Sequence, residues 1–125
     1  MIKVGDTLTY ERVFTKEEVL QFAEISGDKG RHHMIEDANG RLVVHGLLTG
    51  SLPTKLGGDF NLLANKITFN FTRQVFTGDN ITCTAIIKEV THVKEGRMDI
   101  YGTFECVNQD EVTVLYGDFG GVIFE

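Results

Sequence analysis

Residues 43–58 read VVHGLLTGSLPTKLGG and carry a single charged side chain, that of Lys55. Leucines recur at positions 47, 48, 52 and 56 with small residues between them, which leaves no polar stripe of the kind that a surface helix carries. The pattern predicts a helix that is covered on nearly all sides and forms the core. Such a helix has roughly 12 to 15 residues, about half of what a bilayer requires, so we expect burial in protein and not in lipid.

Two glycines four residues apart give this helix one open face. Gly46 and Gly50 fall on the same side, where the missing side chains allow a strand, a partner subunit or a ligand to reach the backbone. Pro53 removes one internal hydrogen bond, which predicts a bend near Gly50, and Gly57-Gly58 ends the helix.

The first 27 residues predict a strand followed by a surface helix. Residues 6–14 alternate as a strand does, and Thr15-Lys16-Glu17-Glu18 has the form of a capping box, so a helix should begin at about Lys16. Gly27 ends this helix. Its inner stripe is expected to comprise Val19, Phe22, Ala23 and Ser26.

Four strand-like runs follow the central helix, at residues 62–72, 80–93, 97–108 and 112–124. Turn residues at 77–79, 95–96 and 108–110 separate the runs, which predicts an antiparallel meander. A hairpin centred on Glu95-Gly96 should place two apolar sets on one face: Ile81, Cys83, Ala85 and Ile87, and Ile100, Phe104 and Cys106. The order of elements predicts an α+β fold, one domain over residues 1–125 in which an antiparallel sheet wraps around a central buried helix.

The composition limits the partners of the chain. A net charge of -6, with no Lys/Arg cluster longer than a pair, would repel a phosphate backbone, which argues against a nucleic-acid partner. The N-terminus has no apolar run that could serve as a signal peptide, so we expect a cytoplasmic protein without a membrane partner. Cys83 and Cys106 have neither CxxC nor Cys/His spacing and are expected to be buried, reduced thiols.

Three segments contain the candidate catalytic and substrate-binding residues. They are Ser26-Gly27-Asp28 followed by His33, Val44-His45-Gly46-Leu47-Leu48 with Ser51, and RQVFTGD at residues 73–79. In this order they resemble the MaoC-like hot-dog proteins, whose members include (R)-specific enoyl-CoA hydratases and acyl-thioester dehydratases. The first matches the Asp and His of the family's Asp-x-Asn-Pro-x-His motif, the second the start of its central helix, and the third its Arg-Pro-Val-x-x-Gly-Asp. The resemblance covers nearly the whole chain.

The resemblance implies a hot-dog fold, a homodimer without a cofactor, and hydration of 2-enoyl thioesters carried on CoA or acyl carrier protein. Asp28 and His33 would be catalytic, because a carboxylate and an imidazole five residues apart on a bend can converge on one water molecule. Which of the two takes the proton from water stays open. The N–H of Gly46, at the positive end of a helix, would bind the thioester oxygen.

Two departures from the family pattern lie near these residues. Gly30 and Arg31 stand where the family has Asn and Pro, and His32 could partly replace the missing Asn by donating a hydrogen bond to substrate or water. The connection from His33 to His45 is also shorter than in typical hydratases.

Simpler roles compete with the catalytic ones. Asp28 could be a turn residue, His33 a solvated loop histidine between Gly27 and Leu42, where periodicity is lost, and Gly46 a packing residue. His45 could fix the start of the helix by a hydrogen bond, and Ser51 is better suited to a helix-side hydrogen bond than to nucleophilic attack, since no Gly-x-Ser-x-Gly surrounds it.

Other chemistries compete with hydration as well. His32, His33, Glu36 and Asp37 suggest a metal site, but neighbouring histidines rarely share an ion and the spacing fits no zinc pattern, so we expect no metal. One positioned carboxylate also suits a thioesterase, in which the water attacks the carbonyl carbon. The missing Asn-Pro pair favours a third alternative, a non-catalytic acyl-CoA-binding module.

Overall fold

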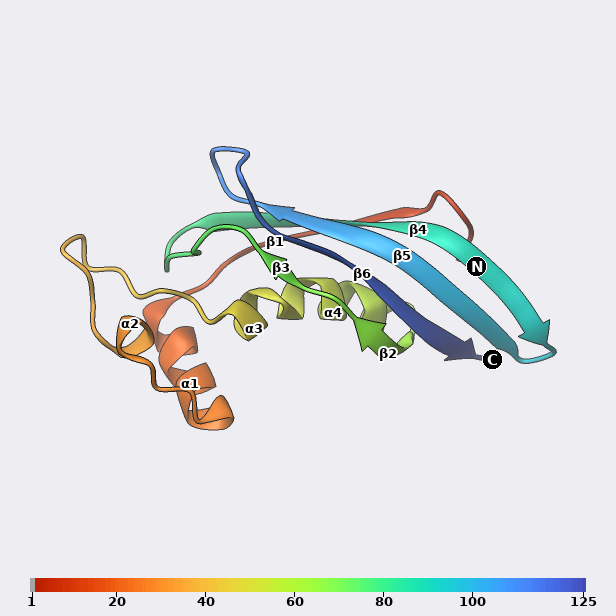
Figure 1. The fold of residues 1–125 in the computed structure, drawn as a ribbon, viewed down its shortest axis with the longest axis horizontal. Coiled ribbons are helices and arrows are strands. Elements are labelled where there is room, and N and C mark those ends of the chain that lie inside the picture. Colours follow the sequence, from red (N-terminus) through yellow and green to blue (C-terminus); the bar gives the residue numbers. More distant parts are fainter. Residues whose placement is uncertain (1) are drawn as a thin grey trace.

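A six-stranded antiparallel sheet curves over one side of the central helices, and two further helices lie at one end of the molecule (Figure 1). The computed structural model describes residues 2–125. Its elements are, in order, β1 (Thr7–Val13), α1 (Lys16–Ser26), α2 (Arg31–Met34), α3 (Gly46–Thr49), α4 (Ser51–Asp59), β2 (Leu63–Ile67), β3 (Asn70–Phe71), β4 (Asn80–Lys94), β5 (Arg97–Val107) and β6 (Thr113–Phe124). The predicted α+β arrangement, a sheet wrapped around a central helix, is confirmed.

The central helix consists of α3 and α4, which meet at Gly50. Gly50 keeps helical backbone angles (φ -61°, ψ -15°), and its N–H donates to the carbonyl of Gly46. The ring of Phe69 lies so close that a Cβ at Gly50 would be 3.0 Å from it. The central helix is divided at Gly50, where the bend is predicted, and the bend itself stays a prediction. The open glycine face is filled by an aromatic side chain from the segment between β2 and β3.

One side of the central helix stays open to solvent. Leu52 and Leu56 are buried in the core, whereas Leu47 is 63% exposed and Lys55 is also exposed. The expectation of cover on nearly all sides is therefore wrong for one copy of the chain, because a single sheet layer covers only one side of a helix. None of the helices in residues 2–125 is long and apolar enough to cross a bilayer.

The strand order confirms the predicted meander for β4, β5 and β6 and corrects it for the run that precedes them. The sheet runs β1-β4-β5-β6-β2, and β3 also pairs with β6, so the run at 62–72 pairs with the last strand and not with the one that follows it. Glycines of β6 explain why the run at 62–72 pairs with that strand. A Cβ at Gly117 would lie 1.8 Å from the carbonyl oxygen of Thr68, and one at Gly121 would lie 2.6 Å from that of Leu63. Only glycine permits this backbone approach.

The hairpin of β4 and β5 confirms the predicted register. Cys83 faces Cys106 and Ala85 faces Phe104 across the two strands, and the turn contains Gly96 with φ 81°. Bulges after Ile87 and after His92 shift the register nearer the turn. The two apolar sets lie in one core, as the parity of the hairpin predicts.

A thiol reagent should find both cysteines as free thiols. Both are buried and unbonded, and the neighbouring Cys83 thiol together with burial raises the pKa of Cys106. Because the thiolate is the reactive form, a thiol reagent should react slowly with the native protein and find two thiols in denaturant without reductant. Finding none in denaturant would mean that the pair is oxidised.

Helix α1 sets the position of the loop that follows it. The Thr15 hydroxyl accepts from the N–H of Glu18, whose carboxylate accepts from the N–H of Thr15 at 3.0 Å, which confirms the capping box. Gly27 ends the helix in the left-handed conformation (φ 78°) and donates to the carbonyl of Ala23. Val19 and Ala23 are buried, while Ser26 is exposed, so the inner stripe is one residue shorter than predicted.

Candidate active site

Asp28 begins the connection between α1 and α2 and is held by local hydrogen bonds. Its N–H donates to the hydroxyl of Ser26 at 3.0 Å, and its Oδ1 accepts from the N–H of Gly30 at 3.1 Å. The Gly30 N–H is the largest cause that lowers the pKa of Asp28, and the nearby histidines lower it further against the opposing effect of desolvation. A carboxylate that accepts from backbone N–H groups stays ionised at neutral pH.

His33 lies on α2 and is buried, with its second nitrogen turned toward Asp28. Nδ1 lies 2.7 Å from the carbonyl oxygen of Val43, which can only accept, so Nδ1 carries the hydrogen of the neutral ring. Nε2 then presents a lone pair 3.6 Å from Asp28 Oδ2. Two acceptors therefore face each other across a gap that is longer than a hydrogen bond.

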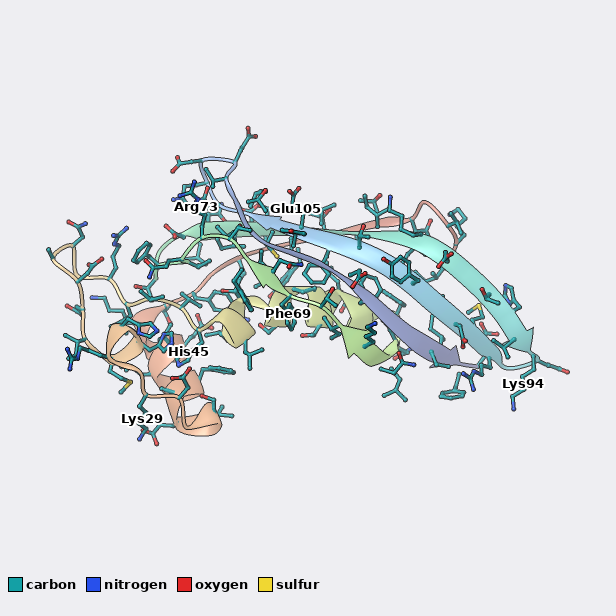
Figure 2. All side chains as sticks on the ribbon, in the orientation of Figure 1. Lys29, His45, Phe69, Arg73, Lys94 and Glu105 are labelled. Atoms are coloured by element: carbon teal, nitrogen blue, oxygen red, sulfur yellow. The ribbon has the colours of Figure 1, made fainter. Side chains whose placement is uncertain are left out.

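His45 joins the start of α3 to the Asp28 segment. Its Nε2 lies 2.9 Å from the main-chain carbonyl oxygen of Asp28 and donates to it. Its ring stacks on that of His33, with centroids 3.7 Å apart and planes 15° apart, and Phe22 contacts it edge-on. Figure 2 shows His45 beside α1 and α2, where α3 begins. The stack fixes the ring of His33 from the core side.

Ligand atoms of Asp28, His33 and His45 lie within 4.8 Å of one another, close enough to suggest a metal site. The two imidazoles are stacked, however, so their in-plane lone pairs run side by side and do not converge on one point. His45 Nε2 is also a donor to a carbonyl oxygen. The arrangement suits proton chemistry better than metal binding.

A cavity of about 420 Å³ opens beside this group. His32, His33, Gly46 and Thr49 line it, together with Phe71 and Arg73. Asp28 is not among the lining residues; its side chain is 58% exposed and lies 3.6 Å from Nε2 of His33, which does line the cavity. The ring of His32 also contacts that of His33, with centroids 3.9 Å apart.

Gly46 is the first residue of α3, and the structure places it in the cavity wall. Within residues 2–125, no acceptor takes its N–H. The ring of Phe71 packs against Gly46, and a Cβ there would lie 2.9 Å from the ring. Ser51 is not brought into the site, because its hydroxyl donates to the carbonyl of Leu48.

Solved structures with the same architecture cover nearly the whole chain. An (R)-hydratase from A. caviae involved in PHA biosynthesis matches with a TM-score of 0.86 and 23% identity, over 99% of this chain and 98% of that one. An (R)-hydratase from Pseudomonas aeruginosa matches with a TM-score of 0.80 and 20% identity, over 98% and 82%. A (3R)-hydroxyacyl-ACP dehydratase complex from Mycobacterium tuberculosis matches with a TM-score of 0.78 and 18% identity, over 95% and 96%.

The chain has the hot-dog fold that these solved structures share. The fold that the sequence resemblance implies is thereby confirmed. No family model matches the sequence, and no curated protein matches it.

Within this hot-dog fold, the segment between Gly27 and Leu42 is not a continuous loop. It contains α2, and His33 on that helix is 5% exposed, so the alternative of a solvated loop histidine is wrong. The cause is the stack on His45 and the hydrogen bond to Val43, both of which come from a part of the chain at least ten residues away.

The sequence analysis missed two residues that line the candidate active-site cavity, Thr49 and Phe71. Thr49 is buried, and its hydroxyl has no hydrogen-bond partner within residues 2–125. Its position three residues after Gly46, on the same helix face, was the available signal. The sequence around Phe71 gave no signal of this kind. Its place in the cavity depends on the pairing of β3 with β6, which is distant in sequence.

Proposed function

We propose that this protein catalyses the reversible hydration of a 2-enoyl thioester to the (R)-3-hydroxyacyl thioester. The observation that carries the proposal is the 3.6 Å gap between Asp28 Oδ2 and Nε2 of His33, a residue that lines the same cavity as Gly46. Two facing acceptors are suited to hold one water molecule, which can donate one hydrogen to each.

Water addition needs a base, a proton donor and a stabiliser of the enolate. In the proposed step, His33 Nε2 takes a proton from the water while its oxygen forms a bond to Cβ of the enoyl group. The electron pair of the double bond moves onto the thioester oxygen, where the N–H of Gly46 donates a hydrogen bond. The imidazolium then returns its proton to Cα, which restores the neutral ring and completes the addition of water.

Asp28 supports this step in two ways. It accepts one hydrogen of the water, which orients the oxygen lone pair, and its negative charge stabilises the imidazolium that forms on His33. Because its pKa is lowered, the carboxylate is the weaker base, so the proton is assigned to His33. The (R) configuration is proposed from the hydratases among the structural neighbours.

Purified protein incubated with crotonyl-CoA tests the proposal directly. Hydration should remove the absorbance of the conjugated enoyl thioester without release of free thiol, and chiral analysis should find the (R) product. Thiol release without hydration would replace the proposal by a thioesterase, and binding without either reaction would replace it by a non-catalytic acyl-CoA-binding module.

A homodimer is proposed, in which central helices lie side by side and sheets join edge to edge. Exposed apolar side chains support it: Leu47 lies on the central helix, and Leu63 and Phe71 lie on β2 and β3 at one margin of the sheet. Some structural neighbours are described as two-component complexes.

Sedimentation should find a dimer at micromolar concentration, and Leu47→Asp should weaken it at least about tenfold by placing a charge in the interface. Val93→Asp is the control, because Val93 is similarly exposed but lies near the β4–β5 turn. A wild-type monomer at that concentration would contradict the proposal.

A further inference from the structure

A second, polar cavity adjoins the candidate active-site cavity. Its volume is about 520 Å³, and its walls come from Arg41, the segment before β4 and the turn between β5 and β6. Arg73 and Gln74 line both cavities, so the two cavities are neighbours at these residues. A long ligand seated in the first cavity and extended over Arg73 and Gln74 would reach the second.

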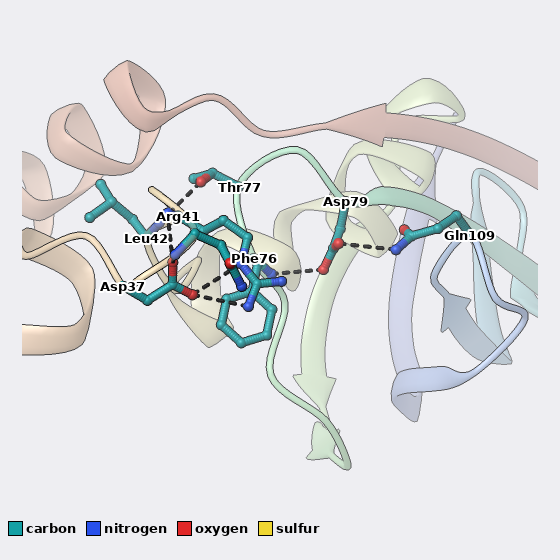
Figure 3. A network of polar contacts seen from close by, with 8 residues as sticks. Asp37, Arg41, Leu42, Phe76, Thr77, Asp79 and Gln109 are labelled. Carbon is teal, nitrogen blue, oxygen red and sulfur yellow. Dashed lines mark hydrogen bonds and ion pairs between the residues drawn. The ribbon is translucent and has the colours of Figure 1, made fainter.

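The walls of the polar cavity are held in place by contacts between distant segments (Figure 3). The guanidinium of Arg41 lies 3.8 Å from the centroid of the Phe76 ring and pairs with Asp37 at 3.0 Å. Asp79 accepts from the N–H of Phe76 at 2.9 Å and from the side-chain amide of Gln109 at 3.1 Å. The cavity therefore has its shape without a ligand, which limits the ordering that a ligand would have to impose.

Arg73 is the free positive charge at the junction. Arg41 and Asp79 already have partners, whereas no carboxylate of residues 2–125 forms an ion pair with the exposed side chain of Arg73. The other cations without such a pair in that range line neither cavity: Arg31, Lys66, Lys88 and Lys94. On a chain of net charge -6, an uncompensated guanidinium at this point favours an anionic ligand group.

We propose that Arg73 binds a phosphate of the carrier arm of the thioester, at the place where the candidate active-site cavity and the polar cavity share lining residues. The inference rests on the proposed function, since it takes the acyl group to lie beside His33. CoA and acyl carrier protein both present the thioester on a phosphorylated pantetheine arm, and guanidinium groups bind phosphate through paired N–H donors.

The test compares substrates with and without a phosphate. Arg73→Gln should raise KM for crotonyl-CoA about tenfold and leave kcat unchanged, because a charge-assisted contact remote from the reacting atoms contributes equally to substrate and transition state. The kcat/KM for the crotonyl thioester of N-acetylcysteamine, which has no phosphate, should not change. Lys66→Gln is the matched control and should change neither value. Asp110→Asn, which removes a negative charge from the same cavity, should lower KM for crotonyl-CoA.

Crotonyl-4′-phosphopantetheine separates the two sources of phosphate. An equal rise of KM for this substrate and for crotonyl-CoA assigns Arg73 to the inner phosphate that both carriers share, and a rise for crotonyl-CoA alone assigns it to the nucleotide of CoA. An unchanged KM for crotonyl-CoA, or an equal loss with the N-acetylcysteamine substrate, overturns the proposal.

Calorimetric binding of CoA itself keeps this inference separable from the proposed function. Binding that is about tenfold weaker in Arg73→Gln supports the arginine site even if the wild type lacks hydratase activity. Equal binding by both proteins, or none by the wild type, overturns the site.

Discussion

Replacement of Asp28 by Asn is expected to lower the turnover number for crotonyl-CoA hydration at least about 100-fold, the usual contribution of a general acid–base group. The change removes the negative charge 3.6 Å from His33 Nε2 and so removes the support for the imidazolium. His33→Asn should lower the turnover number by a similar factor. Its amide can still donate to the carbonyl of Val43, which protects the fold better than alanine would. The double variant should lose little more than the worse single variant, because either change disables the pair.

The control is Asp37→Asn. Asp37 also accepts backbone N–H groups in the connection between α1 and the central helix, and its pKa is lowered for the same kind of reason, but its partner is Arg41 and not a histidine. Its turnover number should stay within about threefold of wild type, as expected for a group outside the reaction. Full hydratase activity in a folded Asp28→Asn protein would refute the role of the pair.

Gly46→Val is expected to lower kcat/KM by at least about 100-fold, the range measured when one oxyanion donor is lost. A Cβ at this position would lie 2.9 Å from the Phe71 ring, so a valine must push the ring aside and fill the space in front of the N–H. The same crowding should lower the melting temperature, and both quantities should be measured together. Gly58→Ala on the same helix is the control, because a Cβ there meets nothing within 4 Å.

The double variant Gly46→Ala with Phe71→Ala separates packing from catalysis. If the glycine serves only to admit the aromatic ring, removal of the ring should restore both stability and activity. If the glycine also lets the thioester oxygen reach the N–H, the alanine Cβ still stands in the way of that oxygen, so stability should recover while activity stays low. Full activity in the double variant would leave Gly46 with a packing role alone.

Local signals predicted the parts of the fold that depend on neighbouring residues. The capping box at Thr15, the left-handed end of α1 at Gly27 and the face shared by Cys83 and Cys106 each follow from residues close in sequence or from the parity of one hairpin. The pairing of β2 with β6 did not follow, because it depends on whether distant backbones can approach at Gly117 and Gly121. Turn residues indicate where a strand ends, but they do not indicate with which other strand that strand pairs.

The candidate site shows the same division. The resemblance selected Asp28, His33 and Gly46, and the structure brings His33 near both of the others. The burial of His33 could not be inferred from its polar surroundings in sequence, because it arises from stacking on His45. Arg73 belonged to a recognised motif, but its position between two cavities depends on the packing of three separate segments.

Val43 closes the segment that carries the two histidines. Its N–H donates to the carbonyl of His32 at 3.0 Å, and its own carbonyl oxygen accepts from His33 Nδ1. The intervening residues 35–42 are thus a loop whose two ends are tied together beside the candidate catalytic residues. Doubling the length of such a loop costs only about 0.6 kcal/mol in closure entropy. Insertions and deletions in residues 35–42 should therefore cost little stability while the imidazole of His33 keeps its place.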